Sequence, residues 1–506
     1  MATTYYTPGV YIEEQPSGSR PIQGVGTAVA GFVGRTEKVP ADTTGPVLVS
    51  NWTQFKTAFG DLAEGLVLPF AVQGFFQNGG GAAYVAGVGE GAAPRPTVEL
   101  PGTGEGAGAV LRVTASEAGA AGPAISVEVT DPAEGNDPAA AYTLIVRAGG
   151  QEERHENLQV KRGAQGGAAA VSGASKLVEV ADAGRGGGRP ANGKYDLAAP
   201  PPSPVDAGSF LGDATERTGL AGLGTIDEIT MLAVPDAVVP AGEGGDADLD
   251  LVKTIQGALV EQAKTLGDRM AILDAPPGMT VQEVLDWKNA QPGIDSPFAA
   301  LYYPWIGIYN PVGNRPVLLP PSGHMAGVWS RSDDTRGVHK APANEPISGA
   351  QELELQVTST EQELLNPQGI NVIRSFPGRG IRVWGARTAT ITDRDWQYIN
   401  VRRLFNYIEE SISEGTQWVV FEPNDQDLWA RIVRTVTAFL TNTWRSGALF
   451  GRTPEQAFYV KCDEETNPPD VVESGQVVIE VGIAAVRPAE FVVFRIAQLT
   501  GGAQSE

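Results

Sequence analysis

Short apolar runs separated by Gly and Pro dominate the first part of the chain, up to about residue 90. Some of these runs are rich in β-branched residues and alternate apolar and polar positions with a period of two, whereas the others have the hydrophobic period of a helix. Such alternation is typical of a sheet with helices packed on its faces. The pattern predicts strands over Thr27–Val33, Val47–Val49 and Tyr84–Val88, and helices over Thr53–Phe59 and Leu66–Phe76.

The same α/β pattern resumes near Ser209. Thr280 followed by Glu283 forms a capping-box pattern, which predicts the start of a helix that continues to Lys288. Repeated strand–helix–strand units indicate a partly parallel sheet covered on both faces. Strands are expected over Ile229–Val234, Met270–Asp274 and Ala300–Tyr309, and an amphipathic helix over Asp248–Leu266.

Residues 91–205 differ in composition, because Gly, Ala and Pro dominate them. Short alternating runs with turn signals between them predict a small β-domain. The strands are expected at Val110–Ser116, Ile125–Thr130, Tyr142–Arg147 and Lys176–Val180. A pure linker is the alternative, and the strand runs argue against it.

The segment from Pro320 to Pro346 has no sustained periodicity, and we interpret it as a long ordered loop. Strands follow within Phe376–Ile391. A helix capped by Thr392 or Asp393 is expected to reach Ile412. A second helix, over Gln426–Ser446, has an apolar stripe at helical spacing. Two more strands are expected, over Ala457–Cys462 and Gln476–Ala485.

Each end of the chain carries a strand-like run without an obvious hairpin partner. The N-terminal run consists of Pro8, Gly9, Val10, Tyr11, Ile12, Glu13 and Glu14, and the C-terminal run of Glu490, Phe491, Val492, Val493, Phe494, Arg495 and Ile496. Unpaired strands expose backbone N–H and C=O groups. Two hypotheses stay open: each run pairs within its own domain, or each is lent to a neighbouring copy by β-augmentation.

Composition narrows the function classes. A net charge of −23 and a pI near 4.6 argue against non-specific nucleic-acid binding. The single cysteine, Cys462, excludes an intramolecular disulfide. We expect no signal peptide, because no basic segment followed by an apolar segment comes after Met1, and no membrane insertion, because no run of about 18 apolar residues occurs.

Candidate catalytic groups are few, and we predict no enzyme activity, cofactor or metal site. His324 and His339 lie in the 320–344 segment with Ser322, Ser330, Asp333 and Asp334, but no nucleophile elbow accompanies them. The third histidine, His155, lies far away in sequence. The same histidines and aspartates are residue types that bind zinc, but their spacing matches no known pair of zinc ligands such as His-Glu-x-x-His. Acidic neighbours disfavour a reactive thiolate at Cys462.

Read along its whole length, the chain resembles the sheath proteins of contractile phage tails, R-type pyocins and extracellular contractile injection systems. The resemblance covers roughly residues 1–90 and 205–500, and the shared order of its motifs is more specific than any one of them. The matching segments are Pro8–Glu14, Phe75–Gly80, Pro320–Asn344, Leu365–Asn371, Arg382–Thr388, Tyr398–Arg403, Phe421–Asn424 and Glu490–Ile496.

The resemblance implies an α/β core with extended arms and a domain order along the chain. That order is a linking strand (1–20), the first part of the core (21–90), a β insertion on the outer surface (91–205), the second part of the core (206–350) and a C-terminal domain (351–506). It also implies a structural subunit that polymerises around an inner tube and contracts, with further copies of itself, the tube, baseplate and terminator proteins as partners. Assembly is expected in the bacterial cytoplasm, with release by lysis.

Three arginines on the last long helix, Arg431, Arg434 and Arg445, lie off its apolar stripe. Solvation or pairing within the chain would explain them, and so would an acidic partner. In sheath relatives a C-terminal helix contacts the tube, so the resemblance implies a tube-binding role for these residues. Arg394, Arg402 and Arg403 on the preceding helix are a competing group.

Two other function classes remain as alternatives. A hydrolase would use the 320–344 segment, and its activity would depend on His324. A carbohydrate-binding protein would use the 91–205 insertion, although only Tyr142 and Tyr195 supply aromatic rings there.

Overall fold

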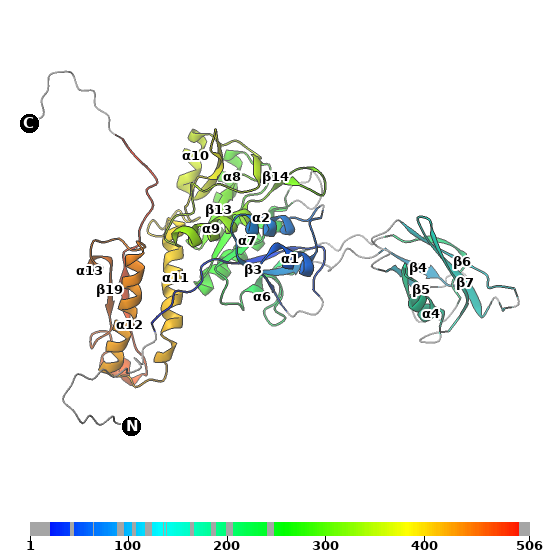
Figure 1. Cartoon of the computed structure of the whole chain (residues 1–506), viewed down its shortest axis with the longest axis horizontal. Coiled ribbons are helices and arrows are strands. Elements are labelled where there is room, and N and C mark those ends of the chain that lie inside the picture. The colour runs from blue at the N-terminus through cyan, green and yellow to red at the C-terminus, as the bar shows by residue number, and fades with distance from the viewer. Residues whose placement is uncertain are drawn as a thin grey trace, which may run out of the picture.

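A mixed eight-stranded sheet forms the centre of the body in the computed structural model (Figure 1). The structure describes residues 21–40, 45–63, 65–88, 96–103, 108–116, 124–134, 136–137, 139–161, 166–183, 189–198, 206–239 and 247–494. The strand order is β18-β17-β13-β12-β11-β1-β3-β2, and only the edge strands β18 and β2 are antiparallel to their neighbours. The strands are β1 (Val29–Arg35), β2 (Val47–Val49), β3 (Ala82–Val88), β11 (Met231–Ala233), β12 (Met270–Asp274), β13 (Ala299–Tyr303), β17 (Ile370–Phe376) and β18 (Gly380–Val383).

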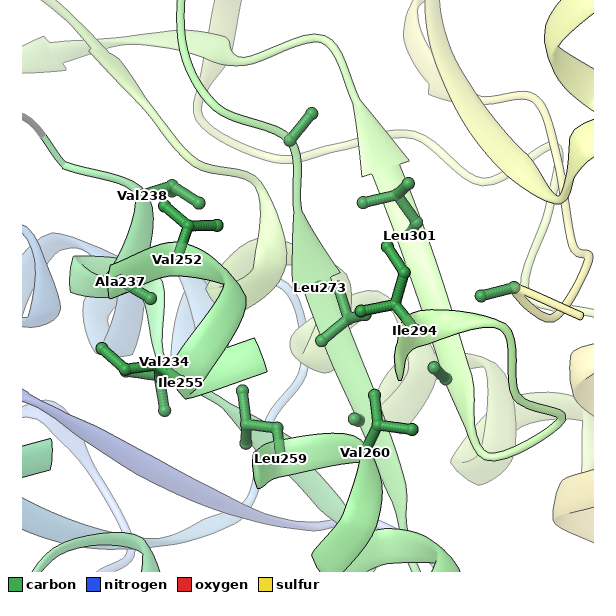
Figure 2. Packing of buried hydrophobic residues seen from close by; sticks show 14 of the residues in the cluster. Val234, Ala237, Val238, Val252, Ile255, Leu259, Val260, Leu273, Ile294 and Leu301 are labelled. Carbon is green, nitrogen blue, oxygen red and sulfur yellow. The ribbon is translucent and has the colours of Figure 1, made fainter. Parts of the chain in front are cut away.

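Helices and short segments cover both faces of this sheet, as the sequence predicts. Successive strand residues alternate between two cores, so that Leu273 and Leu301 enter one and Ile272 and Tyr302 the other. Figure 2 shows the first core, where Leu259 and Val260 pack beside Leu273. It is covered by α5 (Ala207–Leu211), α6 (Gly219–Leu223), η2 (Pro235–Val238), α7 (Leu249–Leu266), α8 (Val281–Asn289), η3 (Pro292–Ile294), and α10 (Ser359–Leu365), which η4 (Asn366–Gln368) follows.

The second core lies under α1 (Trp52–Phe59), α2 (Leu68–Gln77) and α9 (Ser322–Arg336). A three-stranded antiparallel sheet with the order β15-β14-β16 also contributes to it. Its strands are β14 (Ile306–Asn310), β15 (Arg315–Leu319) and β16 (Ala350–Leu353). The expected single strand over Ala300–Tyr309 is therefore two strands, β13 and β14, which belong to different sheets.

The prediction of a loop over 320–346 is wrong, because α9 occupies its first half. This helix is buried on nearly all sides and therefore shows no amphipathic period. Small residues let it approach α2 closely: a Cβ on Gly323 would lie 2.4 Å from the carbonyl oxygen of Ala71, and one on Gly327 would lie 2.4 Å from that of Phe75.

The insertion folds as two facing antiparallel sheets around a core of its own, apart from the body (Figure 1). The sheets have the orders β4-β5-β9 and β10-β6-β7-β8. The predicted strands are present, and β4, β8, β10 and a helix are additions. The elements are β4 (Thr97–Pro101), β5 (Ala109–Ala115), β6 (Ile125–Thr130), β7 (Ala141–Ala148), β8 (Gln151–Gln159), α4 (Gly167–Ala174), β9 (Val178–Asp182) and β10 (Gly193–Asp196).

A fourth core belongs to the C-terminal part, at the end of the molecule opposite the insertion (Figure 1). Within the stretch 351–506, β17 and β18 pack in the central sheet, and the separate core begins with α11. That helix starts at Ile399 and not near Thr392, because residues 391–397 form turns. The elements are α11 (Ile399–Gly415), η5 (Gln417–Val419), α12 (Gln426–Arg445), α13 (Pro454–Ala457), β19 (Phe458–Lys461), α14 (Pro469–Glu473) and β20 (Glu480–Ile483).

Candidate assembly surfaces

The C-terminal run does not form a strand in the part of it that the structure describes, Glu490–Phe494. Four successive apolar side chains are exposed there: Phe491 (73%), Val492 (69%), Val493 (78%) and Phe494 (84%). Arg495 and Ile496 lie outside the described residues. An apolar, extended and unpaired segment is a template for pairing with another chain. We call residues 490–494 the C-terminal arm.

Glu490 fixes the root of this arm. Its carboxylate accepts hydrogen bonds from Arg387 at 3.0 and 2.7 Å, from the Asn366 side-chain amide at 2.6 Å and from the Tyr398 hydroxyl at 3.1 Å. Burial opposes ionisation of Glu490, but the hydrogen bonds and the Arg387 charge outweigh it and lower its pKa. The arm therefore leaves the body from a fixed, charged anchor.

The two-stranded sheet β19–β20 lies close to the arm in sequence. Neither strand has a further strand partner among the described residues, although residues 448–450 bond to residues 484–486, just beyond β20. Val460, Val481 and Ile483 are only partly buried against the C-terminal core. Because an isolated two-stranded sheet is marginally stable, additional strands would complete it. By contrast, the edge strand β18 is covered by residues 344–347, which bond to its backbone at 2.8 to 3.2 Å.

The N-terminal run Pro8–Glu14 lies outside the described residues. The segment that follows it is bound to α11: Ile22 packs on the C-terminal core, and the Val25 N–H donates to Ser411 Oγ at 3.1 Å. A Cβ on Gly24 would lie 2.0 Å from the Tyr407 hydroxyl, so the chain passes very close to the helix. Ile22 thus meets α11 at Gly415, its last residue, whereas the root of the C-terminal arm lies at Tyr398, just before its first.

The three candidate arginines of α12 share its solvent side, opposite the buried stripe that contains Ile432, Val436 and Phe439. Arg431 is held by Glu422 at 3.0 Å and lies over the Trp418 ring at 5.1 Å. Arg434 and Arg445 are exposed, and neither forms an ion pair within the described part of the chain. These two are therefore the freer cations of the stripe.

The competing arginines on α11 are not a surface group. Arg402 and Arg403 are buried, at 6% and 4% exposure. Arg402 stacks over Trp396, with 4.1 Å to the ring centroid. Arg403 donates to both carboxylate oxygens of Asp333 in α9, at 2.8 and 2.6 Å, and to the Thr27 carbonyl at 2.8 Å. This pair joins the body, the C-terminal part and the N-terminal segment, and sequence reasoning missed it because its partners are far apart in the chain. Arg394 is exposed.

The histidine chemistry of the 320–344 segment is not assembled. His324 is buried inside α9 against Gly74, and its burial lowers its pKa to about 4. Asp333, one of the acidic residues that a catalytic or zinc site would use, is instead paired with Arg403. Among the described residues, no group of three His, Cys, Asp or Glu side chains is placed to hold a metal ion.

The cysteine and the two tyrosines that the sequence offers as candidates are packed against neighbouring residues. The Cys462 thiol is buried, and that burial raises its pKa. In the insertion, Tyr142 is buried, and Tyr195 is partly buried against the insertion core with its hydroxyl donating to the Ala191 carbonyl at 3.0 Å. Within the described chain, no helix is both long and apolar enough to cross a bilayer.

Comparison with known proteins gives a consistent result. The family model for the phage tail sheath protein central domain matches residues 233–389, and the model for the phage tail sheath C-terminal domain matches residues 392–498. The tail sheath protein of Burkholderia phage BcepMu is 26% identical over 96% of this chain and 95% of its own length. That of Vibrio phage KVP40 is 24% identical over 52% of this chain, which spans only 42% of that relative.

Solved structures agree. The contracted helical sheath of the anti-feeding prophage superposes with a TM-score of 0.61 at 26% identity, over 98% of this chain and all of that one. The contracted sheath complex of the extracellular contractile injection system PVC shares the fold, with a TM-score of 0.59 at 24% identity over 98% and 99% of the two chains. With two family models that together span just over half of its residues, this chain belongs to the phage tail sheath family and is a structural sheath subunit.

Proposed function

We propose that this subunit polymerises helically around an inner tube by lending strands to neighbouring copies, and that the resulting sheath contracts to drive the tube through a target envelope. The observation that carries the proposal is the C-terminal arm, where four successive apolar residues stand exposed beyond a fixed root. A contact that adds one copy's arm to another copy's sheet is head-to-tail, and such a contact builds an open helical filament when its rotation does not close a ring.

The acceptor of the arm is the β19–β20 sheet of a neighbouring copy. Within the described residues β19 and β20 have no further strand partner, and their apolar side chains are only partly covered, so an added strand supplies both hydrogen bonds and burial. The N-terminal run Pro8–Glu14 is the second linking strand of the same scheme. Contraction is then a rigid-body repacking of subunits that stay joined through their arms.

Arg434 and Arg445 are proposed to contact the tube, with Arg431 as a supporting member of the stripe. A domain inserted into a subunit around a tube fits at large radius, where there is more room. The insertion and the C-terminal core lie at opposite ends of the molecule (Figure 1), which supports an inward orientation of α12. Baseplate and terminator proteins are further proposed partners, and assembly in the cytoplasm with release by lysis is the proposed route.

A proline substitution tests the strand addition. Val492→Pro removes one backbone N–H from the arm, whereas Val492→Thr keeps the N–H and the β-branched shape. We expect the proline variant to stay folded and monomeric, and the threonine variant to form striated tubes in negative-stain electron microscopy. Sheaths of normal length from Val492→Pro would refute the proposed pairing.

A charge reversal tests the tube contact. Arg434→Glu combined with Arg445→Glu is expected to reduce cosedimentation with preassembled tubes, because both cations are exposed and have no ion-pair partner among the residues that the structure describes. Arg394→Glu, an exposed arginine before α11, is the matched control. Equal cosedimentation of both variants with the wild type would remove α12 from the tube interface.

A further inference from the structure

An exposed aromatic residue lies at the turn between α11 and α12. Phe421 is fully exposed, at 103%, and the preceding Val420 is 63% exposed. Phe421 also has a φ of +68°, a left-handed conformation that a bulky side chain rarely adopts. A residue that is both strained and solvent-exposed is not explained by the stability of the subunit, and such outliers gather at functional sites.

The turn around Phe421 is held rigidly. The Asn424 side-chain amide donates to the Gln476 carbonyl at 2.8 Å, and its carbonyl accepts from the Trp429 indole at 2.8 Å. Asp425 caps α12 by accepting from the Leu428 N–H at 2.9 Å. The ring is therefore presented in one place by a fixed frame, which lowers the entropy lost when a partner binds it.

The charges close to the ring in sequence are mixed, because Glu422, Asp425 and Asp427 are exposed there as well as the arginines of α12. Glu422, the next residue, binds Arg431, and Arg434 follows one turn along the same solvent side of α12. An aromatic residue beside arginines is the composition of an interface hot spot. The complementary surface is an apolar pocket.

We propose that Phe421 is the apolar anchor of the contact with the inner tube and that it inserts into an apolar pocket on the tube surface. This inference rests on the proposed function, in which α12 faces the tube, and it adds the residue that supplies the affinity. Continuity with the arginine stripe favours the tube as the occupant, because Glu422, the residue after Phe421, is paired with Arg431 of that stripe at 3.0 Å. A second copy of the chain is the competing occupant.

Phe421→Gly tests the anchor, since two effects of opposite sign are expected. Glycine removes the strain of the positive φ, so the variant is expected to unfold at a higher temperature than the wild type. Loss of the ring is expected to weaken binding to preassembled tubes about tenfold or more. Phe421→Leu, which keeps an apolar side chain, should lose less, and Val312→Ser, at an exposed apolar residue of the β14–β15 turn, serves as the control.

Self-association without tubes, followed by light scattering, is measured on the same variants. Weaker tube binding with unchanged self-association supports the proposal. Reduced self-association with unchanged tube binding overturns it and makes a second copy the occupant. Unchanged tube binding of Phe421→Gly also overturns it, and the Arg434→Glu, Arg445→Glu variant then shows whether the proposed function stands without this anchor.

Discussion

The buried ion pair between Arg403 and Asp333 gives the most quantitative prediction. Both side chains are only 4% exposed, so neither charge is hydrated in the folded subunit. Asp333→Asn leaves the Arg403 guanidinium buried with one carbonyl oxygen in place of a carboxylate. A hydrogen bond to a charged group contributes about 1.5–3 kcal/mol, and removing one partner of a buried pair costs about 3–5 kcal/mol. Because the asparagine oxygen keeps one bond and Thr27 another, we expect the lower end, about 3 kcal/mol.

Urea unfolding followed by tryptophan fluorescence measures this cost, and Trp329 is a local probe because Arg403 lies 4.9 Å over its ring. With a slope of about 2–3 kcal/mol per molar, the midpoint should fall by roughly 1 M urea. Glu422→Gln is the matched control, since the Arg431–Glu422 pair is about 40% exposed and such pairs contribute at most about 1 kcal/mol.

Two observations would refute the reasoning. One is a loss for Asp333→Asn no larger than for Glu422→Gln, which would mean that burial does not govern the cost. The other concerns the double variant Asp333→Leu with Arg403→Met, which removes both charges. It should recover much of the stability, because a buried pair replaced by apolar residues of similar volume is often neutral. A double variant less stable than Asp333→Asn would contradict this.

Three further predictions concern packing, pH and domain independence. Gly327→Ala should destabilise the body by about 1–3 kcal/mol in the same urea assay, because its Cβ would lie 2.4 Å from the Phe75 carbonyl, whereas Gly257→Ala in α7, where a Cβ meets open space, should not. The pKa of Glu490 is lowered in the folded subunit, so the ionised carboxylate stabilises the fold above pH 4.5, the ordinary pKa of the group, and this stabilisation is lost as the pH falls further. Limited proteolysis of the arm should therefore be faster in acid. The Glu490→Gln variant should not show this pH dependence. Residues 96–198 expressed alone should unfold cooperatively in a thermal melt, since their core draws only on that segment, and a non-cooperative melt would contradict an independent domain.

Much of the fold can be predicted from the sequence for those helices and strands that bury only one face, because their apolar residues then recur with a regular period. Three local patterns are reproduced by the structure: the apolar stripe of α12, the capping box of Thr280 and Glu283, and the strand Met270–Asp274. The family could also be recognised from the order of motifs alone. These features depend on neighbours within a few residues, which a single sequence displays directly.

Only the tertiary structure decided the rest. Helix α9 carries no period because it is buried all round, so its sequence could not distinguish it from a loop. Arg403 and Arg434 look alike in sequence, yet one is buried against an aspartate 70 positions away and the other is exposed. The sequence of the C-terminal arm is typical of a buried strand, whereas the structure shows its residues 491–494 exposed and without a strand partner among the described residues. In each case the environment of a residue is set by contacts distant along the chain, which no local pattern encodes.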